Sequence, residues 1–445
     1  MEVENNQLQP LKTFVGIVVA FIGYFAILSF SNAEMLNLNS LLISYFAGLL
    51  AIFIMVRFVD EHARYKNLLI YACIFFSLRM FVGVAHYLYF FESDYLVSYS
   101  STFDYLPEYV WALDSMNLIS GVLNGSLDAD SDHVLTANSI NKNYEMLFFM
   151  SLLFYFGGDK VLVVASFNSL VTLFSAFLVY KISYYLRRNI KTAFFCFTLV
   201  AMQPMEFISS ILARDIFGQF IIIAALYLML SYFYTDYLKY FFILVSSILV
   251  SFVREVYALI PIIAVFSPNI ADDLFKRVIS KKTIVGIVVV FVAALISYDF
   301  VINNILYRFL DKDFFALILA LPVSLVYALV GPFPWTQIFL QPPGYEYHIP
   351  GYLTSIYNFA LMTSTALFFI KYKAEKIDYF ILIFIFLFFL SGILVYGGHH
   401  TTYYSVAIPL LALFDKDSKF PIFFIRFFII FMFWVLMNII YTLVT

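Results

Sequence analysis

Long apolar runs separated by short polar segments recur along most of the chain. A helix needs about 20 predominantly apolar residues to cross a bilayer. Such runs predict membrane helices at 13–31, 40–57, 68–90, 161–186, 192–207, 216–234, 284–301, 352–370, 379–396 and 420–442. The pattern therefore predicts an all-α polytopic integral membrane protein.

Three shorter runs are less simple to place. The run 402–414 is short but is expected to cross the membrane. The runs 143–156 and 314–330 are short or marked by proline, and we expect them to lie in the outer interface or to re-enter the membrane. The expected total is about 11 to 13 crossings, as judged by the length that a crossing requires.

The composition indicates that lipid is the surrounding solvent. Of the 445 residues, 63% are hydrophobic and 12% are charged, and the mean hydropathy is +0.91. Soluble domains run near 45–50% apolar and about 25% charged, so a set of soluble domains is excluded. The net charge of −3 argues against nucleic-acid binding. Cys73 and Cys196 lie in apolar runs and are expected to be reduced rather than joined in a disulfide.

The distribution of Lys and Arg predicts the orientation, because these residues concentrate in cytoplasmic loops. With the N-terminus in the cytoplasm, nineteen of the 26 Lys and Arg residues fall on the cytoplasmic side. The other seven are Arg79, Lys142, Lys160, Arg214, Arg254, Arg308 and Lys312. Of these, Arg79 lies in the middle of a helix and is expected to pair with a group inside the bundle.

The same bias decides how the run 240–268 is arranged. Arg254 and Glu255 interrupt this run, and basic residues flank it at both ends. Both flanks must then lie on one side of the membrane. We therefore expect a hairpin of two short helices, 240–253 and 256–268, with Arg254 and Glu255 at or near its outer tip.

The longest polar stretch, 91–142, is expected to lie on the outer face. Between Phe91 and Asn141 it holds eight Asp and Glu residues and no Lys or Arg. Within it, 104–121 has apolar residues at helical spacing, and Pro107 suits the first turn of a helix. We expect an amphipathic helix in the membrane interface. Its acids either carry chemistry or belong to a capped surface helix with no catalytic role.

Several motifs follow one another in an order that is informative. They are Asp104-x3-Glu108-Tyr-x2-Ala, Asn143–Gly157 with its terminal Phe-Gly, Ser209–Asp215 at a helix start, Ile248–Arg254 at a helix break and Pro332-Phe-Pro-Trp335. In this order the chain resembles the polyprenyl-phosphate-sugar glycosyltransferases of the GT-C superfamily, which include the dolichyl-phosphate-mannose mannosyltransferase-like enzymes of bacteria. Two features depart from that family: the prolines of the 143–157 segment are absent, and two helices precede residue 60.

The resemblance implies a transferase that moves a sugar from a polyprenyl-phosphate donor to a lipid-linked or cell-surface glycan acceptor. It also implies that the reaction takes place on the outer face of a bacterial plasma (inner) membrane. Such a reaction needs a carboxylate to take the proton of the acceptor hydroxyl. Asp104 is the expected base, with Asp94 and Glu108 as rivals.

The departing lipid phosphate needs cations or a metal ion to hold it. Arg214 and Asp215 open a helix on the outer side, where they either bind phosphate or form a pair at the lipid surface. Arg254 and Glu255 occupy a costly position unless they face a polar cavity. They are expected to bind phosphate or to hold the hairpin together as an ion pair.

Two outer loops carry further candidate ligands. His399 and His400 follow a Gly-Gly pair, and they bind phosphate, bind a divalent metal ion together with loop carboxylates, or are polar loop residues without a ligand. Trp335, Tyr345 and Tyr403 are expected to stack on the sugar of the acceptor or to anchor the chain in the interface.

Two other classes of protein stay open. An O-antigen or capsular polysaccharide polymerase is expected to carry several Arg in a large, late outer loop, whereas 302–351 holds only Arg308 and Lys312 as basic residues. A polysaccharide-lipid transporter or flippase should show internal repeats and matched broken helices, and the sequence shows no convincing duplication. The sequence also lacks a Walker, dinucleotide-binding or HExxH motif. Because the large acidic loop comes early in the chain and the late loop has few basic residues, the sequence favours the transferase.

Overall fold

The computed structural model describes the greater part of the predicted helices. The described residues are 9–30, 38–59, 65–91, 156, 161–203, 214–233, 236–251, 255–276, 348–396, 405–416 and 420–444. Every regular element in these ranges is a helix, as the apolar runs predict. The chain divides into two compact units, which are described separately below.

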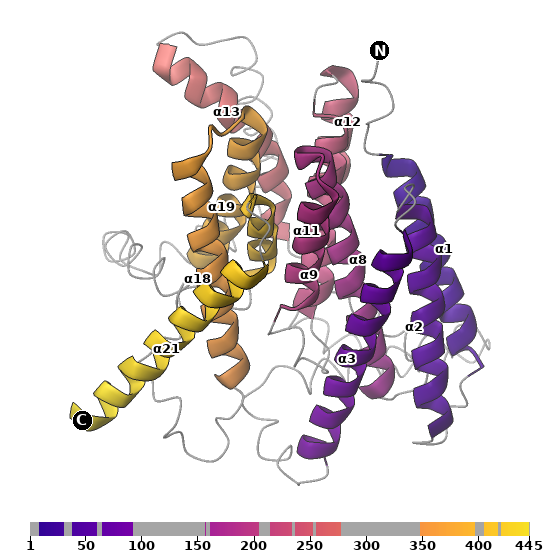
Figure 1. Cartoon of the computed structure of the whole chain (residues 1–445). Helices are drawn as coiled ribbons and strands as arrows, with labels where there is room; N and C mark the ends of the chain where they lie inside the picture. Colours follow the sequence, from indigo (N-terminus) through magenta and orange to yellow (C-terminus); the bar gives the residue numbers. More distant parts are fainter. Residues whose placement is uncertain are drawn as a thin grey trace, which may run out of the picture. The chain divides into compact units, whose positions relative to one another are not determined.

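The first unit comprises Met1–Lys181 and Val200–Phe220. Its helices are α1 (Pro10–Leu28), α2 (Leu38–Val59), α3 (Tyr65–Phe91), most of α8 (Val161–Arg187), the end of α9 (Ile190–Ala201) and the start of α11 (Arg214–Ser231). Helix α2 packs against both α1 and α3, and Figure 1 shows the three side by side.

Small residues let α1 and α2 approach closely. A Cβ atom added at Gly16 of α1 would fall on the Cβ of Phe58 in α2, and one added at Gly23 would meet Ile54 Cδ1 at 3.1 Å. Glycine at helix contacts is typical of membrane bundles, because lipid supplies no hydrophobic drive and association depends on close packing. The buried Tyr24 hydroxyl then joins α1 to α8 by donating to Ser166 Oγ over 3.2 Å.

The second unit comprises Ile182–Leu199 and Ile221–Thr445. Besides the remaining parts of α8, α9 and α11, it contains α12 (Asp236–Ser251), η2 (Glu255–Leu259), α13 (Ile260–Lys276), α18 (His348–Lys371), α19 (Lys376–Tyr396), η4 (Ser405–Phe414) and α21 (Phe420–Val444). In Figure 1 η4 lies beside α18 and α19, and it contacts both of them.

Local chemistry makes the sharp turn between α8 and α9. Arg188 follows α8 with a φ of 51°, the left-handed conformation that commonly ends a helix. Asn189 then caps α9, since its Oδ1 accepts from the backbone N–H of Lys191 at 2.9 Å and of Thr192 at 3.4 Å. The turn is therefore encoded by these two polar residues.

The run 240–268 contains two helices that contact each other, as the predicted hairpin requires. These are α12 and α13, and the described residues just before α13 form the short 3-10 helix η2. Both helices are longer than expected, beginning at Asp236 and ending at Lys276. The position of the tip relative to the membrane stays a prediction.

Two expected helices differ from the structure. The run 192–207 is expected to form one helix, but α9 ends at Ala201. The physical reason is that Pro204 disfavours the α conformation at the residue before it, Gln203. Within the run 402–414, Ser405–Phe414 forms a 3-10 helix, η4, with Pro409 inside it, and its residues from Ala407 to Phe414 are buried.

Four helices in the described part of the chain are long and apolar enough to cross a membrane. They are segments of α1, α2, α8 and α21. The span in α21 is buried over only 11% of its length and exposes large residues such as Phe428 and Ile429. Apolar faces of this size are costly in water, so these helices support a membrane protein. The number of crossings and their orientation stay predictions.

Candidate functional site

Most residues that the sequence predicts for the site lie outside the described ranges. These are Asp94, Asp104, Glu108, Arg254, Trp335, Tyr345, His399, His400 and Tyr403. The backbones of three others are described: Arg214 and Asp215 are the first two residues of α11, and Glu255 is the first residue of η2. Their assigned roles are therefore untested by the geometry.

The early end of α9 is the first unusual feature of the described chain. The helix has 12 residues, which corresponds to about 18 Å. The hydrocarbon core of a bilayer is about 30 Å thick. Helix α9 is therefore shorter than the hydrocarbon core, and a helix end inside that core would leave backbone carbonyl groups that are costly without partners.

Arg79 satisfies the last carbonyl of α9. The Arg79 side chain, on α3, is only 2% exposed. Its Nε and Nη2 donate to the Ala201 carbonyl oxygen over 3.0 and 2.6 Å. A cation suits this position, because a helix C-terminus carries unsatisfied carbonyl groups and partial negative charge. The expectation that Arg79 pairs inside the bundle is confirmed, and the group it binds is a backbone carbonyl.

Two glutamines extend this polar region. Gln219 Nε2 donates to Gln203 Oε1 over 3.2 Å, and each residue is 3% exposed. The Gln203 backbone N–H also donates to the Val200 carbonyl over 3.3 Å, which closes the end of α9. We call Arg79, the Ala201 carbonyl, Gln203 and Gln219 the buried polar centre.

The buried polar centre lies close in sequence to a predicted phosphate-binding pair. Gln219 follows Asp215 by four residues on α11, which is about one helical turn. Neither Gln203 nor Gln219 is among the site residues that the sequence predicts. The available signal was a single amide side chain inside the apolar run 216–234, since buried amides need hydrogen-bond partners.

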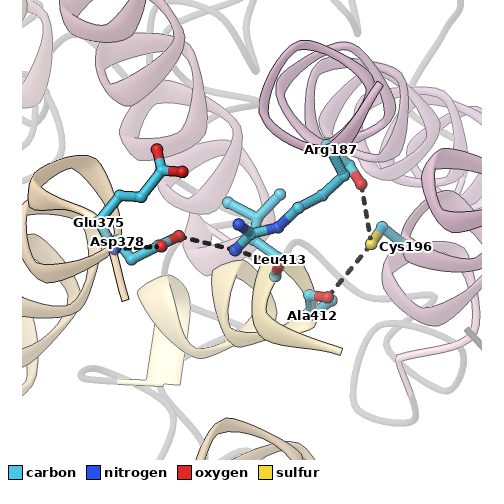
Figure 2. A network of polar contacts seen from close by, with 7 residues as sticks. Arg187, Cys196, Glu375, Asp378, Ala412 and Leu413 are labelled. Atoms are coloured by element: carbon cyan, nitrogen blue, oxygen red, sulfur yellow. Dashed lines mark hydrogen bonds and ion pairs between the residues drawn. The ribbon is translucent and has the colours of Figure 1, made fainter. Parts of the chain in front are cut away.

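A second polar network lies in the other unit, where several helices end (Figure 2). Arg187 Nη2 donates to Asp378 Oδ1 over 2.7 Å, and the two side chains are 10% and 1% exposed. The same nitrogen lies 3.5 Å from the Leu413 carbonyl oxygen. The Arg187 guanidinium also sits 4.8 Å from the centre of the Phe368 ring. This one side chain therefore ties the end of α8 to α19, η4 and α18.

Cys196 belongs to the same network. Its Sγ accepts from Ser183 Oγ at 3.3 Å and donates to the Ala412 carbonyl at 3.2 Å, so α9 is held against η4 (Figure 2). Cys196 is fully buried and Cys73 is partly exposed, and neither forms a disulfide. Both cysteines are free in this structure, and their reduced state stays a prediction.

Another polar group, made of Arg426, Ser364 and Asp415, holds the start of α21. Arg426 Nη1 donates to Ser364 Oγ over 2.7 Å and lies 3.7 Å from Asp415 Oδ2. Ser364 Oγ in turn donates to Asp415 Oδ2 over 2.9 Å. Buried carboxylates are tolerated when they are paired and hydrogen-bonded. This polar group therefore has a structural explanation without a ligand.

Within the described ranges, no three His, Cys, Asp or Glu side chains come together as a metal site would require. Comparison with protein-family models, with curated proteins and with solved structures finds no match to this chain. The functional conclusion therefore rests on the sequence motifs and on the geometry of the buried polar centre.

Proposed function

We propose that this protein is a membrane glycosyltransferase. It moves a sugar from a polyprenyl-phosphate donor to a lipid-linked or cell-surface glycan acceptor on the outer face of a bacterial plasma membrane. The observation that carries the proposal is the bond from Arg79 to the Ala201 carbonyl. This bond links α3, which leads into the acidic loop, to the end of α9, which leads toward Arg214 and Asp215.

Charge supports an outer position for both connected segments. Basic residues lie beside Tyr65 and Ile190, where α3 and α9 begin, and such residues favour the cytoplasmic side. The acidic loop after α3 and Arg214 after α9 are then expected on the outer side.

An arginine buried at membrane depth is itself an argument for function. Such residues are rare because a charge is costly in hydrocarbon, and by default they mark substrate or ion paths. In the proposed enzyme Arg79 has a positioning role, because its Nε and Nη2 both donate to the Ala201 carbonyl. It fixes the end of α9 and so the start of the segment that precedes Arg214.

The chemistry follows from the residues that the sequence provides. Asp104, or one of its rivals Asp94 and Glu108, accepts the proton of the acceptor hydroxyl as the oxygen attacks the sugar carbon. The bond from that carbon to the lipid phosphate breaks, and the phosphate leaves with the electron pair. Arg214 and Arg254 stabilise the departing negative charge.

The remaining candidates complete the proposed site. His399 and His400 bind the donor phosphate, or a divalent metal ion together with loop carboxylates. Trp335, Tyr345 and Tyr403 stack on the sugar rings. Asp215 and Glu255 hold the neighbouring arginines by ion pairing.

The test measures sugar transfer in proteoliposomes with a polyprenyl-phosphate sugar and a lipid-linked acceptor. Asp94→Asn, Asp104→Asn and Glu108→Gln are compared one by one with the wild type. We expect Asp104→Asn to lower the rate about 100-fold or more, as the removal of a general base does. Asp130→Asn, in the same loop, is the matched control and should retain transfer. Near-normal transfer by all three test variants would refute the assignment of the base.

A transporter or flippase for a polysaccharide lipid is the second candidate. The observation that favours it is the short length of α9, which has 12 residues, because discontinuous helices often form transport sites. The same proteoliposomes separate the two functions. Movement of a fluorescent lipid-linked sugar between leaflets without a new glycosidic bond identifies a transporter. Growth of long chains from lipid-linked repeat units identifies a polymerase of the O-antigen kind.

A further inference from the structure

In the second unit, ion pairs bury two aspartates and so leave mainly cations on the surface at the helix ends where these pairs lie. Asp378 and Asp415 are 1% and 6% exposed, and their partners are Arg187 and Arg426. Both carboxylates are thus buried and neutralised inside the unit. They do not offset the cations on the surface at the same ends of the helices.

The exposed charge at these helix ends is strongly positive. Among the described residues there, six cations are exposed, namely Arg188, Lys191, Lys371, Lys373, Lys376 and Lys416. We call this set the basic rim. Glu375 is the one exposed carboxylate that the described residues place among them. Figure 2 shows its carboxylate directed away from Asp378.

Two contacts between distant chain segments show that the basic rim belongs to one region. The Arg187–Asp378 ion pair joins the end of α8, beside Arg188, to the start of α19, beside Lys376. Lys416 Nζ lies 4.4 Å from the centre of the Tyr372 ring, which joins the end of η4 to the end of α18. The rim therefore draws cations from several chain segments that meet at one end of the second unit.

The surroundings of the basic rim select a lipid as its partner. Next to Lys371, Ile370 is 79% exposed, and Tyr379, three residues after Lys376, is 50% exposed. Tyrosine favours the boundary between the headgroups and the hydrocarbon of a membrane. A ligand that matches both the cations and the neighbouring apolar side chains has a negative headgroup joined to an apolar chain.

We propose that the basic rim binds the phosphate headgroups of anionic phospholipids in the leaflet at this end of the molecule. Clusters of Lys and Arg beside membrane helices attract anionic lipids, and the attraction weakens with salt. Arg188 and Lys416 are held beside tyrosine rings, so part of the rim is oriented before a lipid arrives. The inference is independent of the proposed transfer reaction.

The test uses the purified full-length protein and fluorescent lipids in mixed nanodiscs. Enrichment around the protein is measured for phosphatidylglycerol against phosphatidylcholine. We expect preferential enrichment of phosphatidylglycerol, and a loss of about fivefold or more in the variant K191Q/K373Q. High salt should weaken the preference in the wild type. Both substituted side chains are exposed, and a thermal melt verifies that the variant is folded.

A matched double variant in the first unit provides the control. Lys12 and Arg57 are also exposed, so K12Q/R57Q removes the same charge outside the basic rim. We expect this variant to lose clearly less enrichment than K191Q/K373Q. Equal enrichment of both lipids in the wild type would overturn the proposal. So would an unchanged preference in K191Q/K373Q, or an equal loss in the two variants.

Discussion

Arg187 and Asp378, 191 residues apart, form an ion pair of 2.7 Å at the edge of the second unit. The Asp378 carboxylate has a second function, because its other oxygen accepts from the Glu375 backbone N–H over 2.9 Å. That bond satisfies a donor at the start of α19, where a carboxylate also suits the positive end of the helix. One aspartate thus both begins α19 and fixes Arg187.

Loss of one partner of this pair should strongly destabilise the protein. Arg187→Met leaves the Asp378 carboxylate buried without its cation, which costs about 3–5 kcal/mol of unfolding free energy. Chemical unfolding in detergent micelles measures the change. The double variant Arg187→Met with Asp378→Leu should be more stable than Arg187→Met alone, because it removes the uncompensated charge.

Lys373→Gln is the matched control for this experiment. Lys373 is exposed in the same region, and surface substitutions usually change stability by less than about 0.5 kcal/mol. If Arg187→Met and Lys373→Gln have the same free energy of unfolding, the ion pair does not stabilise the second unit.

Arg79 should be needed for the end of α9 in the first unit. Arg79→Met leaves the Ala201 carbonyl without the two donors, and an unsatisfied buried acceptor costs about 1–3 kcal/mol. Arg79→Lys should recover part of this loss, since lysine keeps the charge but lacks the fixed fork of donors. Thermal unfolding in nanodiscs tests both variants.

The neighbouring Leu78 provides a control on the same helix. Leu78 is 46% exposed, so Leu78→Ala should have a small effect. Equal melting temperatures for Arg79→Met and Leu78→Ala would contradict a stabilising role for the Arg79 bonds.

Two glycines on α1 should respond oppositely to alanine. At Gly16 the new Cβ would overlap Phe58 Cβ, which cannot move without α2. Overpacking of this kind costs about 1–3 kcal/mol. At Gly23 the nearest atom is the Ile54 Cδ1 methyl group at 3.1 Å, which can rotate away. Alanine also favours a helix over glycine by about 1 kcal/mol.

The measured free energy of unfolding should therefore be lower in Gly16→Ala than in the wild type. In Gly23→Ala it should equal or exceed the wild-type value. In a Phe58→Gly background, which removes the Phe58 Cβ, Gly16→Ala should lose its destabilising effect if the overlap is the cause. If the two single changes alter the free energy of unfolding equally, the close contact of α1 and α2 at Gly16 does not determine the effect of alanine there.

The two cysteines should differ in their reaction with small thiol reagents. Cys196 is fully buried between Ser183 and Ala412, whereas Cys73 is partly exposed. In the variant Cys73→Ala, the remaining thiol should react only when the unit opens locally. In Cys196→Ala it should react faster. Mass spectrometry of labelled protein follows both rates, and both thiols should react after denaturation. Equal rates in the folded protein would contradict the burial of Cys196.

Hydropathy predicts most described helices to within a few residues. The runs 13–31 and 420–442 correspond to α1 and α21, and 161–186 corresponds to α8. The hairpin over 240–268 also follows from charge, because a flank of lysines on each side fixes both ends. The predicted catalytic residues are a different matter: Asp104 and its rivals lie outside the described ranges, so their roles rest on the resemblance alone.

The apolar pattern alone shows that this is a helical membrane protein, because an apolar run of membrane length must satisfy its backbone internally. The end of α9, and the 3-10 helix at 405–414 with its buried residues from Ala407 on, emerge only when the chain packs. Packing also selects the partners of Arg79 and Arg187, which lie 122 and 191 residues away. Hydropathy reports the average preference of a segment for lipid. A single carbonyl or carboxylate finds its cation only when distant helices pack together.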